Sequence, residues 1–211
     1  MIIIDFGSGS TCRNDKELIH EMLEALTDVD PKRLATPKFQ LWGPGTEPQC
    51  SMLNWGLFEE AVEYGRHLGY RVTASVFDKE SVEFLLGFDP PFVKIANRPY
   101  LRHLAKYVPR GIPIVYSRDG ALNDIFEVPE GRFMVCVPRY PATIEDYEGL
   151  FGLKNATYLK EGISDHTIGL DLWRKHKPHI YEKHFRLESS TGPDAGPWAA
   201  TASELKEVFN V

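Results

Sequence analysis

The sequence has 211 residues, of which 43% are hydrophobic and 26% are charged, as in an ordinary globular protein. Its 24 basic and 30 acidic residues give a formal net charge of −6, which argues against nucleic acid as the main partner. No apolar run approaches the roughly 20 residues of a membrane-spanning helix, and Met1–Ile4 is too short for a signal peptide. We therefore expect one cytoplasmic domain over residues 1–211, with no nucleic-acid and no membrane partner.

The three cysteines are scattered along the chain at Cys12, Cys50 and Cys136. They form no CxxC motif, so neither a disulfide framework nor a zinc ribbon is indicated. We expect all three to be reduced thiols, as is usual in the cytoplasm.

Short runs rich in β-branched and aromatic residues alternate with amphipathic segments along the chain. The pattern predicts eight strands, at 1–5, 34–42, 71–77, 92–96, 112–117, 132–137, 156–163 and 179–184. It predicts helices at 15–26, 54–68, 79–86, 100–107, 143–151, 168–176 and 203–209. We expect Asn54 to cap the second helix, Gly69 to end it, and Ser203 to cap the last one.

Eight strands that alternate with helices indicate parallel βα units, for which a closed barrel and an open doubly wound sheet are the alternatives. The strand count favours an α/β fold of the (β/α)₈ TIM-barrel type. Because 211 residues is near the short end for that fold, we expect a trimmed barrel. Residues 118–131 are poorly periodic, which predicts a minimal or missing helix after the fifth strand. In such barrels, functional groups lie where strands end.

Polar side chains gather at the expected carboxyl ends of these strands. Two of them are lysines, Lys38 and Lys94, and a buried ammonium group is costly unless it is paired. Together they favour a site for a phosphate or carboxylate ligand, whereas the alternative is that each lysine extends to the surface. The full set is Asp5, Lys38, Gln40, Ser75, Lys94, Ser117, Tyr140, Ser164–His166 and Glu182–His184.

His166 and His184 end two neighbouring strands, the seventh and the eighth. Neutral imidazoles placed in this way can share one divalent ion and leave positions open for substrate and water. The alternative is a pair of hydrogen-bonded core histidines. The adjacent carboxylates Asp165 and Glu182 either orient these histidines or pair with Lys183 and nearby donors.

Motifs along nearly the whole chain resemble the barrel domain of the sialic acid synthase family, the phosphoenolpyruvate-condensing enzymes that make nonulosonic acids. The most specific part is the pair ISDHTIG and YEKHF, preceded by KFQ and KIA. The matching segments are KFQ at 38–40, ASVFD at 74–78, VKIAN at 93–97, PIVYS at 113–117, RYP at 139–141, ISDHTIG at 163–169, YEKHF at 181–185 and GPD at 192–194.

The resemblance implies a transferase that condenses phosphoenolpyruvate with an open-chain N-acylated hexosamine, ManNAc-like, with or without a 6-phosphate. It implies that His166 and His184 hold a divalent metal, usually Mn²⁺ with Mg²⁺ or Co²⁺ as alternatives, which polarises the aldehyde. The third carbon of phosphoenolpyruvate then attacks the aldehyde, water adds to the resulting oxocarbenium carbon, and phosphate leaves. By position, the resemblance assigns phosphoenolpyruvate binding to Lys38, Ser75, Lys94, Ser117 and Ser164, and the sugar side to Asp5, Gln40, Tyr140 and Asp194, with catalytic roles for Asp5, Tyr140 and Asp194.

On the sugar side the sequence departs from the family pattern. The departures are Asp5 where Glu is common, Asn97 where Ser is usual, Pro99 for a sugar-contacting Glu, Pro138 for an Asn that touches phosphoenolpyruvate, and Ala195 for a His that often follows GPD. The family also carries a C-terminal antifreeze-like domain that reaches into the partner subunit's sugar site. Residues 1–211 show only the barrel, so a homodimer and a complex with a separate capping subunit are both expected arrangements.

Two other functions therefore remain open beside the synthase. One is another metal-dependent aldolase or lyase reaction on the same barrel, since this fold hosts many chemistries. The other is a degenerate barrel that binds a ligand without chemistry. The presence of two lysines and two histidines, Lys38, Lys94, His166 and His184, at the same end of the expected barrel argues against a degenerate site.

Overall fold

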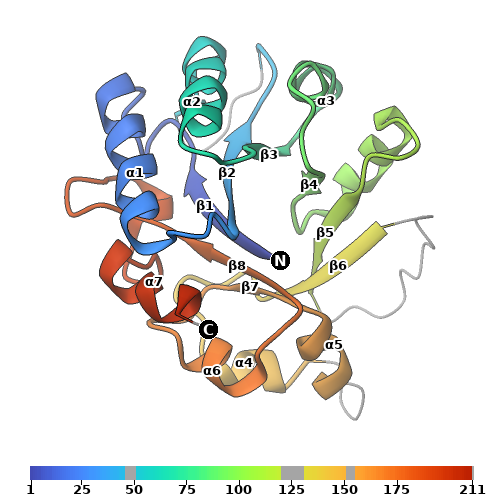
Figure 1. The fold of residues 1–211 in the computed structure, drawn as a ribbon. Helices are drawn as coiled ribbons and strands as arrows, with labels where there is room; N and C mark the ends of the chain where they lie inside the picture. The colour runs from blue at the N-terminus through green and yellow to red at the C-terminus, as the bar shows by residue number, and fades with distance from the viewer. Residues whose placement is uncertain (46–50, 120–130, 151–154, 211) are drawn as a thin grey trace.

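The computed structural model describes residues 1–45, 51–119, 131–150 and 155–210. Eight parallel strands pair in chain order and close into a barrel, with helices around the outside (Figure 1). This confirms the (β/α)₈ prediction over the open-sheet alternative. The strands are β1 (Ile2–Gly7), β2 (Ala35–Leu41), β3 (Thr73–Val76), β4 (Val93–Ile95), β5 (Ile114–Arg118), β6 (Gly131–Cys136), β7 (Gly162–Asp165) and β8 (Ile180–His184). The helices are α1 (Lys16–Val29), α2 (Trp55–His67), α3 (Lys79–Leu86), α4 (Ile144–Glu148), α5 (Asn155–Glu161), α6 (Asp171–His176) and α7 (Ala202–Phe209), with 3₁₀ helices η1 (Pro99–Tyr107) and η3 (Pro193–Ala195).

Alternation along the strands separates two apolar clusters. The larger cluster joins the outer strand faces to the helices, for example Tyr181 of β8 and Ile4 of β1. The smaller cluster comes from the opposite strand faces and fills the barrel interior, with Ile3, Phe92, Val115, Met134 and Ile180. Two residues further along these strands come Asp5, Lys94, Ser117, Cys136 and Glu182. The inner apolar cluster therefore lies directly beneath a layer of polar side chains at the carboxyl end of the barrel, which we call the mouth.

Two of the three predicted helix boundaries are confirmed. Asn54 caps α2, because its side-chain oxygen accepts the Gly56 N–H at 2.8 Å, and Gly69 follows the helix with a φ of +90°. Ser203 is not the cap of the last helix but lies inside α7, and Thr201 is the cap. The reason is the Thr-x-x-Glu spacing of a capping box, in which the Thr201 N–H donates to Glu204 at 2.8 Å.

The seventh strand is predicted too early in the sequence. Residues 155–161 form α5 and only Gly162–Asp165 form β7, because the barrel register pairs Ile163 with Val135 of β6. Tyr158 of α5 packs its ring at 5.5 Å from that of Phe133. Helix α4 is also shorter than predicted, and the region predicted to lack a full helix after β5 falls mostly on residues 120–130, outside the described residues.

The structure also tests two expectations from composition, that the cysteines are free thiols and that no helix spans a membrane. Cys12 and Cys136 are buried free thiols, as predicted, whereas Cys50 lies outside the described residues. Within the described ranges, no helix is long and apolar enough to cross a membrane.

Candidate active site

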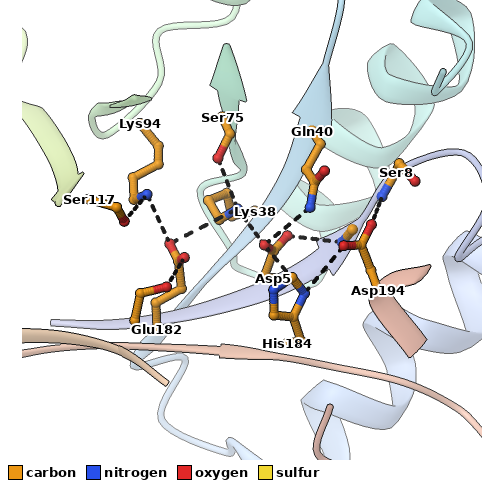
Figure 2. Close-up of polar contacts among 12 residues, drawn as sticks. Asp5, Ser8, Lys38, Gln40, Ser75, Lys94, Ser117, Glu182, His184 and Asp194 are labelled. Atoms are coloured by element: carbon orange, nitrogen blue, oxygen red, sulfur yellow. Dashed lines mark hydrogen bonds and ion pairs between the residues drawn. The ribbon is translucent and has the colours of Figure 1, made fainter. Parts of the chain in front are cut away.

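The structure brings most of the predicted site residues to one end of the barrel, and Figure 2 shows these of them together there: Asp5, Lys38, Gln40, Ser75, Lys94, Ser117, His184 and Asp194. Most of them are almost fully buried, although the side chains are polar or charged. Lys38 and Lys94 are 1% and 2% exposed, so the alternative that they extend to the surface is wrong. Tyr140, at 48% exposure, marks the rim.

Lys38 is the centre of the first group of contacts. Its Nζ lies 2.7 Å from Asp5 Oδ2 and donates a hydrogen bond to Ser75 Oγ at 3.0 Å. Burial alone would lower the pKa of Lys38, but the charges of Asp5 and Glu182 outweigh burial and raise it. For Asp5, burial acts to raise the pKa, but Lys38 and His184 lower it to about 2. Both groups are therefore charged at neutral pH, and Gln40 completes the group by donating to Asp5 at 3.5 Å.

Lys94 lies on the other side of the mouth, and its carboxylate partner is more distant than that of Lys38. Its Nζ donates to Ser117 Oγ at 2.7 Å, and the carboxylate that faces it, Glu182, is 3.8 Å away. Burial lowers the pKa of Lys94, and the attraction of Glu182 offsets this only in part. An anion that reaches Lys94 would supply the acceptors that this ammonium group can still use.

Glu182 lies between the two lysines. Its Oε1 accepts a hydrogen bond from Ser164 Oγ at 2.9 Å, whereas its Oε2 is buried and has no hydrogen-bond partner among the described residues. The hydroxyl of Ser164 is thus engaged by Glu182 in this structure. Glu182 therefore belongs to the site: its partners are Ser164, Lys38 and Lys94, and the predicted pairing with Lys183 falls to Asp165.

Asp165, by contrast, lies on the outer face of β7 and pairs with Lys183. The Lys183 Nζ is 3.3 Å from Asp165 Oδ2, which also accepts a hydrogen bond from Tyr181 OH at 2.7 Å. Thr167 donates to Asp165 Oδ1 through its N–H at 2.8 Å and its hydroxyl at 2.7 Å. This carboxylate is fully used by the fold.

His166 and His184 face each other with ring centroids 5.4 Å apart. Nδ1 of His166 lies 2.7 Å from the carbonyl oxygen of Val137, so this nitrogen donates and Nε2 keeps its lone pair. Burial, and then the nearby His184, lower the pKa of His166 to about 3, which keeps the imidazole neutral. His166 therefore bonds to the backbone rather than to His184, unlike the hydrogen-bonded core pair that was the alternative.

The histidine pair fits a divalent metal by its donor chemistry. Nδ1 of His184 is buried, has no hydrogen-bond partner among the residues that the structure describes, and faces Asp5 Oδ2 at 3.6 Å and Asp194 Oδ1 at 3.9 Å. A carboxylate or carbonyl beside Nδ1 with Nε2 left over is the arrangement usual for histidines that bind metals. In the described part of the chain, no group of three or more His, Cys, Asp or Glu side chains is arranged to hold a metal. The two histidine rings are candidate ligands by their donor chemistry alone.

The rim is formed by an aromatic group and by the loop that carries Asp194. The ring of Tyr140 lies 4.1 Å from that of His166 and 5.4 Å from that of Trp198. The backbone N–H of Ser8 donates to Asp194 Oδ2 at 3.3 Å, which joins the β1 loop to η3. Gly7 is required at this junction, because its φ is +73° and a Cβ there would lie 2.9 Å from that of Asp194.

Sequence reasoning missed two residues that shape the site. Trp198 borders Tyr140 at the rim, and no spacing in the sequence linked it to the mouth. Tyr147 of α4 is fully buried; its hydroxyl donates to the Ser164 carbonyl at 2.5 Å and accepts the His166 N–H at 3.0 Å. Because β7 ends at Asp165, the His166 N–H lies beyond the strand, and Tyr147 supplies its acceptor.

Fold and site together define a (β/α)₈-barrel protein with two buried lysines, paired with carboxylates, beside two buried histidines. Comparison with known proteins gives the family: the NeuB family model matches residues 48–210, and the chain belongs to the NeuB family. A pseudaminic acid synthase of Campylobacter jejuni is 29% identical over 165 residues, which cover 70% of this chain and 48% of the relative. An N,N'-diacetyllegionaminic acid synthase of Legionella pneumophila is 28% identical over 63% of this chain and 43% of that protein.

The fold has a close counterpart among solved structures. An N-acetylneuraminic acid synthetase from Leptospira borgpetersenii, crystallised with citrate, superposes with a TM-score of 0.76 at 20% identity, over 99% of this chain and 81% of that one. At this identity the likeness shows the fold alone. The chain spans about half the length of the curated relatives it matches.

Proposed function

We propose that the protein catalyses the metal-dependent condensation of phosphoenolpyruvate with the aldehyde of an N-acylated hexosamine, giving a nonulosonic acid and phosphate. The observation that carries the proposal is the pair of buried lysines, Lys38 and Lys94, beside the buried histidines His166 and His184 in a member of the NeuB family. The names of the relatives, pseudaminic and legionaminic acid synthases, support a product of the nonulosonic acid type.

The anionic substrate would bind at the floor of the mouth. Lys38 and Lys94 are charge partners for the phosphate and carboxylate of phosphoenolpyruvate, and the hydroxyls of Ser75 and Ser117, which already contact these lysines, add hydrogen bonds. Ser164 joins them if its hydroxyl turns from Glu182. Because the lysines are buried, the substrate's charges are held away from water, where each contact is stronger.

The acceptor sugar would bind nearer the rim. Asp5, Gln40 and Asp194 line the side where His184 lies, and Tyr140 borders His166. His166 and His184 would hold the divalent metal, for which we propose Mn²⁺, and this metal supplies Lewis-acid polarisation of the sugar aldehyde. The carboxylates of Asp5 and Asp194 would orient His184 and accept hydrogen bonds from sugar hydroxyls.

We further propose a cytoplasmic location, which the free thiols Cys12 and Cys136 support. A homodimer or a separate capping subunit remains a prediction.

The test is phosphate release from phosphoenolpyruvate in the presence of Mn²⁺ and a panel of N-acyl hexosamines, each with and without a 6-phosphate. The His184→Ala protein is the matched control. Release that requires metal, sugar and His184 together would establish the synthase and identify its acceptor. If phosphoenolpyruvate binds but no sugar supports release, the condensation with this class of acceptor is wrong. If phosphoenolpyruvate does not bind at all, the ligand assignment is wrong and a degenerate barrel is the better account.

A further inference from the structure

The carboxylate of Glu182 occupies the position that an anionic ligand would be expected to take. Its Oε2 lies 4.0 Å from the Nζ of Lys38 and 3.8 Å from that of Lys94, between the two cations (Figure 2). The side chain is 4% exposed, and its Oε2 has no hydrogen-bond partner within the described part of the chain. It is thus close enough to attract both lysines, but it forms a hydrogen bond with neither.

The charges at the floor of the mouth balance before any ligand binds. Two buried ammonium groups, Lys38 and Lys94, face two buried carboxylates, Asp5 and Glu182. Lys38 is closely paired with Asp5 at 2.7 Å, whereas the carboxylate facing Lys94 stays 3.8 Å away. The hydrogen bond from Ser164 to Oε1 holds Glu182 in this intermediate position.

This arrangement affects ligands of different charge unequally. A simple anion that binds one lysine meets the negative charge of Glu182 a few ångströms away, and such like-charge contacts inside a protein oppose binding strongly. A molecule with two separate anionic groups on one short skeleton can engage both lysines at once. It gains two close attractions where a simple anion gains one, although Glu182 repels both of its anionic groups. The floor therefore favours a two-headed anion over a single one.

We propose that Glu182 is a built-in counter-anion that weakens the binding of anions between Lys38 and Lys94, so that a simple anion such as phosphate binds poorly and a ligand with two anionic groups, which engages both lysines, binds well. The proposal rests on the proposed function in one respect, since phosphoenolpyruvate is the two-headed ligand considered. The proposal predicts that an anion binds more tightly when the negative charge of Glu182 is removed.

The test compares the wild type with Glu182→Gln, which keeps the shape of the side chain and removes its charge. Isothermal titration with inorganic phosphate should give a dissociation constant at least about tenfold lower in the variant. Phosphoenolpyruvate should also bind more tightly to the variant, because Glu182 repels its anionic groups too, and in both proteins it should bind more tightly than phosphate because it engages both lysines. Glu188→Gln is the matched control, because this side chain is 87% exposed and its substitution changes the net charge equally.

Two further readouts separate charge from structure. Glu182→Asp retains the charge and should keep the phosphate affinity within about threefold of the wild type. Because Glu182→Gln leaves two buried cations with one carboxylate, its melting temperature should be lower, and phosphate should raise it more than in the wild type.

Unchanged or weaker phosphate binding by Glu182→Gln, with a cooperative thermal transition, would overturn the proposal. So would equal gains from Glu182→Gln and Glu182→Asp. The phosphate comparison does not depend on the condensation reaction. If the wild type fails to bind phosphoenolpyruvate while Glu182→Gln binds phosphate more tightly, the proposed function fails and the role of Glu182 as counter-anion stands.

Discussion

The β7–β8 pair carries a buried carboxylate on each face, and each carboxylate faces buried lysines in a different way. On the outer face, Asp165 accepts three hydrogen bonds and pairs with Lys183, which also donates to the Thr167 carbonyl at 2.6 Å. On the inner face, Glu182 accepts one hydrogen bond, and its second oxygen stays 3.8 Å from Lys94. The outer cluster is complete and holds the fold, whereas the inner one has polar atoms left over for a ligand.

Removal of Asp165 should produce the largest effect and should fall on stability. Asp165→Ala leaves Lys183 buried without its counter-charge and frees the donors of Tyr181 and Thr167. We expect the free energy of unfolding to fall by about 3–5 kcal/mol, as measured by urea denaturation. A loss below about 1 kcal/mol would show that the outer cluster is not structural.

Removal of a histidine should affect metal binding with little effect on the fold. His184→Ala takes away one of two candidate ligands at the rim, so Mn²⁺ affinity should fall at least roughly 100-fold. The readout is a Mn²⁺ titration followed by electron paramagnetic resonance. His176→Ala serves as the control, because this histidine lies on α6 beside Glu148 and away from the mouth. Equal Mn²⁺ affinity in the wild type and His184→Ala would remove the histidine pair as the metal site.

Substitution of Lys94 should separate binding from stability. Lys94→Met keeps the length of the side chain and removes a cation that burial disfavours. Phosphoenolpyruvate affinity should fall by about 2 kcal/mol, roughly 30-fold, while the unfolding free energy stays the same or rises. Calorimetric titration and urea denaturation of the same preparation measure both. If the protein is instead destabilised and still binds the ligand normally, Lys94 belongs to the fold and not to the site.

The smallest effect is expected for Tyr147, whose hydroxyl joins the backbone of Ser164 to that of His166. Tyr147→Phe removes the hydroxyl that receives the His166 N–H and donates to Ser164. The unfolding free energy should fall by about 1–3 kcal/mol, because two buried backbone groups lose their partner. Mn²⁺ affinity should fall with it, since the backbone of His166 is no longer held. Intact Mn²⁺ affinity would show that the Val137 contact alone fixes this ring.

The inner residues could be predicted from the sequence because a barrel places strand ends together. Asp5 and Ser117 end predicted strands, and Lys38 and Lys94 lie in the middle of two others, so the strand pattern was enough to bring them together. The predicted strand at 156–163 was wrong because local β propensity does not show which residues reach the barrel register. Tyr147 and Trp198 escaped notice for a related reason, since their partners are set by packing between distant segments.

The central claim is that the inner face of the mouth holds a two-headed anion beside a histidine-bound metal. A crystal structure with phosphoenolpyruvate and Mn²⁺ tests it directly. We predict anionic oxygens of the ligand within hydrogen-bond distance of both Lys38 Nζ and Lys94 Nζ, and the ion on the Nε2 atoms of His166 and His184. A ligand bound elsewhere, with the lysines unchanged beside Asp5 and Glu182, would contradict the account.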